Sequence, residues 1–136
     1  MKWSWIKRRL KGYDCFKFLC GKSPEREKEN DKMAIPNLQV ALDHLRIEDA
    51  LKDALAVGNE VDIIEAGTIL ILNEGDKAIK CLRNVFPDKV VIADTKCADA
   101  GSTVAKNCKD AGADWMTVIC CATIPTMKAA QKEIGT

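Results

Sequence analysis

The sequence predicts an α/β protein in which four strands and four helices alternate to form a parallel sheet. Apolar, β-branched runs are centred near Val40, Ile63, Val91 and Val118, about 23 to 28 residues apart. A segment with helical periodicity follows each run. Repeated strand–helix units of this length produce right-handed crossovers between parallel strands, so the four units are expected to form one sheet.

Each expected element has local support. The expected strands cover residues 38–42, 61–66, 89–93 and 115–120. The expected helices cover residues 47–55, 74–84, 102–110 and the segment from Ile124. Gly58 and Gly112 stand where the first and third helices should end. Pro125 falls in the first turn of the fourth helix, where the missing N–H costs little.

Four β-α units are half of an eight-stranded (β/α)8 TIM barrel, a fold of about 250 residues. Two interpretations follow: a small open sheet in its own right, or the first half of such a barrel. A half barrel has two exposed parallel edges and one uncovered face. The sequence stops directly after a helix, with no capping strand, which favours the half barrel.

Charge divides the chain into residues 1–33, a basic arm with a charged linker, and residues 34–136, the α/β domain. Residues 1–33 hold ten Lys and Arg against five Asp and Glu, whereas the remainder is mildly acidic. Apolar residues at three- and four-residue spacing in 1–22 predict a basic amphipathic helix. It could contact an anionic membrane or a partner, form an unstructured tail, or precede a true start at Met33.

Composition excludes several classes of protein. No apolar run approaches the roughly 20 residues that a membrane span needs, and no apolar segment follows the first positive charges as in a signal peptide. The seven cysteines form no C-x-x-C pair, and His44 is the single histidine, which argues against disulfides and zinc. We expect reduced, buried cysteines, including Cys120 and Cys121, a cytoplasmic location and no nucleic-acid partner.

Acidic residues recur where the expected strands end. Asp43 ends the first strand, Glu65 lies in the second, and Asp94, Lys96 and Asp99 follow the third. The carboxyl ends of parallel strands meet at one edge, so these side chains should converge. Buried carboxylates need a partner, and carboxylate oxygens suit Mg2+. The pattern therefore predicts a Mg2+ site beside a protonated lysine that can donate a proton.

Four segments resemble 3-keto-L-gulonate-6-phosphate decarboxylases, a branch of the orotidine-5′-monophosphate decarboxylase superfamily of (β/α)8 barrels. The segments are residues 38–43 (LQVALD), 61–68 (VDIIEAGT), 93–101 (ADTKCADAG) and 113–122 (ADWMTVICCA). The D-x-K-x-x-D pattern marks the superfamily, and the ADAG and VICCA segments point to the ketogulonate branch. The resemblance covers about three quarters of the chain and the N-terminal half of the family barrel.

The resemblance implies a role for each acid and for the lysine. Asp43 would contact substrate hydroxyls, and Glu65 and Asp94 would hold Mg2+. Lys96 would stabilise the enediolate left by CO2 loss, with Asp94 beside it as a further catalytic group. Asp99 would orient Lys96. In this family the active sites lie at a homodimer interface, so Asp99 would act in the neighbouring subunit's site.

The implied reaction is the Mg2+-dependent decarboxylation of 3-keto-L-gulonate 6-phosphate to L-xylulose 5-phosphate, a step of L-ascorbate catabolism. Two alternatives stay open: an aldolase of the hexulose-6-phosphate synthase type, and a non-catalytic remnant whose arm binds a membrane or partner. The family's phosphate-binding loops follow strands seven and eight, which this sequence lacks. We therefore expect little activity from the chain alone.

Overall fold

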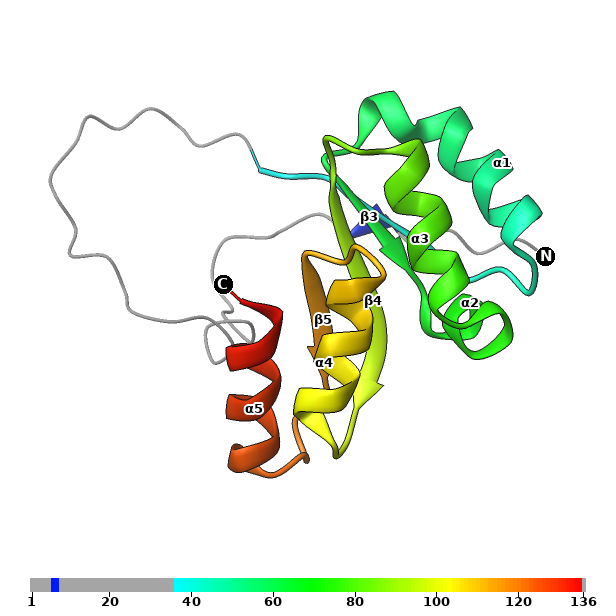
Figure 1. Cartoon of the computed structure of the whole chain (residues 1–136). Coiled ribbons are helices and arrows are strands. Elements are labelled where there is room, and N and C mark those ends of the chain that lie inside the picture. The colour runs from blue at the N-terminus through cyan, green and yellow to red at the C-terminus, as the bar shows by residue number, and fades with distance from the viewer. Residues whose placement is uncertain (1–5, 8–35, 136) are drawn as a thin grey trace, which may run out of the picture.

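The computed structural model describes residues 6–7 and 36–135, which form one mixed sheet with helices alongside it (Figure 1). Its strands are β1 (Ile6–Lys7), β2 (Gln39–Leu42), β3 (Ile63–Ala66), β4 (Val90–Cys97) and β5 (Trp115–Val118). Its helices are α1 (Ile47–Val57), the 3-10 turn η1 (Gly58–Glu60), α2 (Thr68–Glu74), α3 (Asp76–Val85), α4 (Gly101–Asp110) and α5 (Ile124–Ile134). The predicted alternation of four strands with helices is confirmed.

The strands lie in the order β1-β2-β3-β4-β5, and β2 to β5 are parallel. Their carboxyl ends therefore meet at one edge of the sheet. Glu65 of β3 lies opposite Ala41 of β2 and opposite Ile92 of β4. This register decides which polar side chains come together at the candidate site.

Both faces of the sheet are buried at its centre. One face packs against α1, α2, α3 and α4 through six apolar side chains: Val40, Leu42, Ile64, Ala66, Val91 and Ala93. Because successive strand side chains point to opposite faces, Ile63, Glu65, Ile92 and Asp94 belong to the other face. Each of these four is only 7–8% exposed. Two carboxylates thus lie on a buried sheet face beside the apolar side chains of Ile63 and Ile92.

The last two helices, α4 and α5, pack closely against each other. Gly101 starts α4, and a Cβ atom at this position would collide with the backbone oxygen of Thr126 in α5. The side chain of Thr123 accepts a hydrogen bond from the Thr126 amide at 3.3 Å and caps α5. Pro125 lies in the first turn of α5, so the predicted start of this helix is confirmed.

Several predicted element boundaries were wrong. The expected third strand ended at Ala93, but β4 continues to Cys97, so the D-x-K segment lies within the strand. The expected second helix began at Glu74, yet α2 precedes it, and the chain breaks at Gly75, whose φ is +59°. The short apolar run of α2 is rich in β-branched and aliphatic residues, so its periodicity did not indicate a helix.

The predicted basic helix in residues 1–22 is wrong at Ile6 and Lys7, the two residues of the arm that the structure describes. Ile6 and Lys7 form a short strand that pairs antiparallel with β2. The free hydrogen-bonding edge of β2 explains this, because an extended segment satisfies its backbone groups. The rest of the predicted helix and the charged linker lie outside the described residues.

The prediction of buried cysteines holds for some positions only. Cys97 and Cys108 are buried and Cys81 is partly buried, but Cys120 and Cys121 are exposed. β5 ends at Val118, so this pair belongs to the following turn, in which the Ala122 amide bonds the Ile119 carbonyl at 3.1 Å. A strand two residues shorter than expected thus moves both thiols to the surface.

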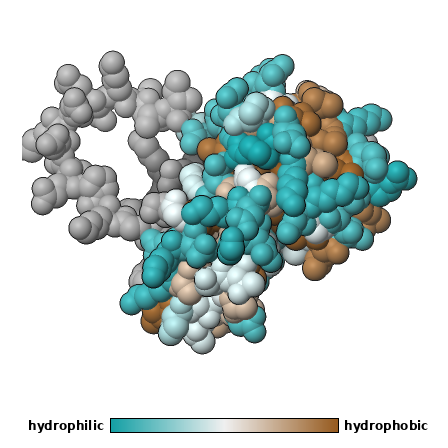
Figure 2. All heavy atoms as spheres, viewed as in Figure 1, coloured by the Kyte–Doolittle hydropathy of each residue, from teal (hydrophilic) through white to brown (hydrophobic). Residues whose placement is uncertain are grey.

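On the face seen in Figure 2, hydrophilic residues predominate, and hydrophobic residues gather at the side formed by α1 and α2. Leu55 of α1 and Leu72 of α2 are 63% and 76% exposed. Leu45, in the loop before α1, is 69% exposed. None of the helices in residues 36–135 combines the length and apolar character required to cross a membrane.

Arg83 of α3 joins the loops at the amino-terminal ends of β4 and β5. Its guanidinium donates to the carbonyl oxygens of Gly112 and Lys89, each at 2.8 Å, and pairs with the Asp114 carboxylate. The same carboxylate accepts a hydrogen bond from the Val91 amide at 2.7 Å. Arg83 therefore fixes β4 and β5 relative to each other at the edge opposite the site.

Replacing Arg83 tests this role. Arg83→Ala should lower the free energy of unfolding by about 2–4 kcal/mol, because several acceptors lose a charged donor together. Arg46→Ala is the matched control, since the Arg46 side chain is 70% exposed and pairs with the exposed Glu48. Its effect should stay within about 0.5 kcal/mol. Urea unfolding measures both, and equal losses would contradict the assignment.

Candidate active site

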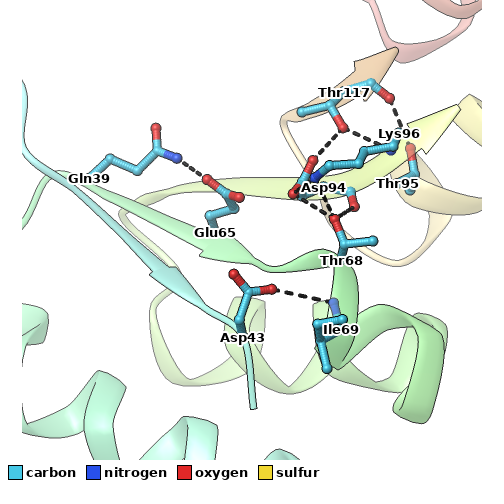
Figure 3. Close-up of polar contacts among 9 residues, drawn as sticks. All are labelled: Gln39, Asp43, Glu65, Thr68, Ile69, Asp94, Thr95, Lys96 and Thr117. Atoms are coloured by element: carbon cyan, nitrogen blue, oxygen red, sulfur yellow. Dashed lines mark hydrogen bonds and ion pairs between the residues drawn. The ribbon is translucent and has the colours of Figure 1, made fainter. Parts of the chain in front are cut away.

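The carboxyl-terminal ends of β2, β3 and β4 carry the polar residues that the sequence singled out (Figure 3). Glu65 and Asp94 lie on the same sheet face, since Ile92 is opposite Glu65 and Asp94 follows two residues later. Asp43 follows β2 directly. The strand ends that carry these residues are thus neighbours at one edge of the sheet, whereas no contact joins the three acidic side chains directly in the described residues.

Asp94 is the most constrained member of the site. Thr117 of β5 donates its hydroxyl to Oδ1 of Asp94 at 2.7 Å, and Thr68 of α2 donates to Oδ2 at 2.7 Å. The Lys96 ammonium forms an ion pair with the same Oδ2. Burial raises the pKa of Asp94, but the hydrogen bonds from Lys96, Thr117 and Thr68 outweigh it and hold the pKa below its ordinary value. Asp94 is therefore a buried carboxylate kept ionised by its neighbours.

A strand irregularity brings Lys96 to Asp94. Ala93 of β4 pairs with Met116 of β5, and Cys97 pairs with Val118. Residues 94–96 therefore lie opposite the single residue Thr117, as in a β-bulge with extra residues. Lys96 adopts a left-handed backbone with φ +47°, and its amide donates to the Thr117 hydroxyl at 2.9 Å. Such conformations in a non-glycine residue cost energy and concentrate at functional sites.

Glu65 supplies a second buried carboxylate, whose Oε2 is bonded by the Gln39 side chain from β2. Glu65 and Asp94 supply hard oxygen donors of the kind that Mg2+ prefers, and Mg2+ needs only one or two carboxylates when water and substrate oxygens complete its shell. Among the described residues no cluster of three or more acidic, cysteine or histidine side chains could hold a metal. The fit therefore rests on the two hard oxygen donors of one sheet face.

Asp43 is exposed and held near the start of α2. Its Oδ1 accepts a hydrogen bond from the Ile69 amide at 3.3 Å. A Cβ atom on Gly67 would overlap this carboxylate and crowd the Leu42 carbonyl. Glycine at this position therefore gives the Asp43 side chain its space beside α2.

Asp99 is not brought to Lys96 by any contact among the described residues. Its side chain is exposed, and its backbone oxygen accepts a hydrogen bond from the Cys97 thiol at 2.8 Å. Burial, and then the Asp99 charge, raise the pKa of Cys97, so this thiol stays protonated. The structure thus joins Asp94 and Lys96 directly, while the roles predicted for all five residues, Asp43, Glu65, Asp94, Lys96 and Asp99, stay predictions.

Two threonines and a glutamine belong to the site although the sequence patterns assigned them no role. Thr68 and Thr117 contact Asp94 and Lys96, and Gln39 contacts Glu65. Thr68 follows Gly67 and precedes a mainly aliphatic run, and Thr117 alternates with apolar residues in β5. Hydroxyl residues are common in such places, so only their partners identify them.

Four β-α units with an aspartate–lysine pair at the strand ends are the arrangement of the first half of a (β/α)8-barrel enzyme. The chain belongs to the Orotidine 5'-phosphate decarboxylase / HUMPS family, whose model matches residues 36–136. The predicted resemblance and the half-barrel fold class are therefore confirmed.

Individual relatives narrow the comparison. The 3-keto-L-gulonate-6-phosphate decarboxylase of Escherichia coli strain K12 is 52% identical over 96 residues, covering 71% of this chain and 44% of that protein. The crystal structure of KGPDC from Streptococcus mutans has 62% identity and a TM-score of 0.69, over 71% of this chain and 46% of that chain. The 3-hexulose-6-phosphate synthase from Salmonella typhimurium has 37% identity and a TM-score of 0.68, over 70% and 45%.

This chain spans less than half the length of each of these relatives. The part that it shares with them carries the strand ends described above. The relatives with 52% and 62% sequence identity to this chain are thus carboxy-lyases.

Proposed function

We propose that this chain carries the acid–lysine half of an active site that decarboxylates 3-keto-L-gulonate 6-phosphate to L-xylulose 5-phosphate. The observation that carries the proposal is the buried Asp94 carboxylate with the Lys96 ammonium on it, at the carboxyl edge of a parallel sheet. Identity of 52% to a decarboxylase of that name supports the choice of substrate. A place in L-ascorbate catabolism and in the cytoplasm follows from the same proposal.

Lys96 is the residue best placed to handle the charge of the reaction. Loss of CO2 breaks a C–C bond, and its electron pair moves to the neighbouring carbonyl to give an enediolate. The Lys96 ammonium lies on the Asp94 carboxylate, so it can stabilise this negative charge and then return a proton to carbon. Asp43, exposed at the carboxyl end of β2, would accept hydrogen bonds from substrate hydroxyls.

Mg2+ is the proposed cofactor, with Glu65 and Asp94 as its protein ligands. The ion would supply positive charge beside two adjacent substrate oxygens. The place of both carboxylates on one buried sheet face supports the assignment. Ligands that the fold has already fixed lose little conformational freedom when an ion binds.

Mg2+ titration tests the cofactor directly. Glu65→Gln should weaken Mg2+ binding to the 136-residue chain by about tenfold or more, because a charged ligand becomes neutral. Glu60→Gln is the matched control, since Glu60 is exposed and lies just before β3. Isothermal titration calorimetry measures both. Equal affinities for the two variants would contradict the metal assignment.

The reaction is tested in a chimera, because the chain spans under half of its relatives. Residues 36–136 are joined to the remaining β-α units of the Escherichia coli decarboxylase and assayed for CO2 release. We expect release, and a fall of about 100-fold or more in kcat for Lys96→Ala, the usual size of a general-acid contribution. Lys80→Ala, at an exposed position of α3, should retain activity.

The same chimera separates the two candidate reactions. A folded chimera that releases no CO2 argues against the decarboxylase proposal. Condensation of formaldehyde with ribulose 5-phosphate would instead favour the aldolase, which the match to 3-hexulose-6-phosphate synthases makes the second candidate.

We further infer a homodimer in which Asp99 serves the neighbouring subunit. Asp99 is exposed and makes no contact with Lys96 in the described part of the chain. Apolar side chains also lie exposed near the site: Ile69, whose amide bonds Asp43, is 43% exposed, and Leu72 is 76% exposed. A second copy would cover these side chains and present its own Asp99.

Mixing inactive variants tests this arrangement. Lys96→Ala and Asp99→Ala chimeras should each lose activity. If Asp99 acts across the interface, a mixture of the two forms hybrid dimers with one intact site and recovers up to about a quarter of wild-type turnover. The CO2 assay measures the recovery. A mixture as inactive as its components would place Asp99 in its own subunit's site.

A further inference from the structure

The two oxygens of the Asp94 carboxylate are each bonded by a different threonine. Thr68 approaches Oδ2 from the start of α2, and Thr117 approaches Oδ1 from β5, both at 2.7 Å (Figure 3). The carboxylate is therefore held from two elements other than its own strand. Only an orientation of the Asp94 side chain that meets both hydroxyl donors keeps the two hydrogen bonds. The two threonines therefore fix the plane of the carboxylate.

Thr68 also holds the lysine. Its hydroxyl has a single proton, which the 2.7 Å contact directs to Asp94, and its lone pairs accept a hydrogen bond from the Lys96 ammonium at 2.6 Å. The Lys96 side chain is 55% exposed, so packing alone does not immobilise it. Ordering a lysine side chain costs up to about 2 kcal/mol of conformational entropy. The contacts to Thr68 and Asp94 therefore decide where the ammonium lies.

Thr117 holds the backbone of the same lysine. Its hydroxyl accepts the Lys96 amide at 2.9 Å while donating to Asp94, and its carbonyl accepts the Thr95 hydroxyl at 3.0 Å. One residue of β5 thus bonds all three residues of β4 that lie opposite it. The pairing of β4 with β5 is interrupted between Ala93 and Cys97. The Thr117 hydroxyl therefore replaces the backbone partner that the amide of Lys96 would have in a regular sheet.

We propose that Thr68 and Thr117 are positioning residues that fix the Asp94 carboxylate and the Lys96 ammonium relative to each other. Thr68 sets the direction of the ammonium, and Thr117 sets the backbone from which the lysine projects. The catalytic consequence of this proposal rests on the proposed function. Its structural part concerns only how well the Lys96 side chain and backbone are held in place.

The structural part is tested on the 136-residue chain by NMR. The side-chain order of Lys96, from 13C relaxation at Cε, should fall in Thr68→Val and return close to the wild-type value in Thr68→Ser, which restores the hydroxyl. Thr103→Val is the matched control, because Thr103 is exposed on α4, and it should leave the order unchanged. Unchanged order of Lys96 in a folded Thr68→Val chain would overturn the role of Thr68.

Thr117→Val provides a second measurement that does not depend on the first variant folding. The amide hydrogen of Lys96 should exchange about fivefold faster, which corresponds to a lost hydrogen bond of about 1 kcal/mol. Thr117→Ser should restore slow exchange. Exchange at the wild-type rate in Thr117→Val would overturn the role of Thr117.

The catalytic consequence is measured in the decarboxylase chimera. Thr68→Val should lower kcat by about 10- to 100-fold with little change in KM, as expected when a group that orients a reacting residue is lost. Thr68→Ser should recover most of the rate. A wild-type kcat in Thr68→Val would overturn the catalytic consequence. A chimera without any turnover would instead refute the proposed function, and the NMR measurements would then decide the positioning role by themselves.

Discussion

The buried charge of Asp94 is the constraint on which the candidate site depends. Asp94 is only 8% exposed, so its carboxylate needs partners, because an unpaired buried charge is strongly unfavourable. Here an ammonium and two hydroxyls satisfy it, from β4, α2 and β5. Each partner belongs to a different element, so the site forms only when the strands and α2 have reached their final positions. The fold itself therefore fixes how Asp94 and its partners are arranged.

The opposite edge of the sheet supports this arrangement. Arg83 and Asp114 join the amino-terminal ends of β4 and β5, and Asp114 also bonds the Val91 amide. These contacts fix the pairing of the two strands before the irregularity begins, which brings Thr117 opposite residues 94–96. A parallel barrel is commonly divided in this way, with stability at one edge and chemistry at the other. In this chain Arg83 and Asp114 lie at the amino edge, and Asp94 and Lys96 lie at the other.

Periodicity predicted the alternation of four parallel strands with helices because this alternation shows in local spacing. Asp43, Glu65 and Asp94 could be chosen from sequence because acids at successive strand ends are unusual. The extra residues of β4 and the contacts of Thr68 and Thr117 could not, since they depend on the register between two strands far apart in sequence. The exposure of Cys120 and Cys121 was missed for a related reason. An apolar run does not show where its hydrogen-bonded ladder stops.

The irregularity in β4 explains why an aspartate and a lysine two residues apart can share one hydroxyl partner. In a regular strand both side chains would project from one face, about 7 Å apart along the chain, each opposite its own β5 residue. Because residues 94–96 share Thr117, Lys96 turns to φ +47° and its ammonium folds back onto Asp94. A left-handed non-glycine residue costs about 1–3 kcal/mol. The ion pair and the hydroxyl contacts offset this cost. Removing any one of them should therefore leave Asp94 and Lys96 less firmly held relative to each other.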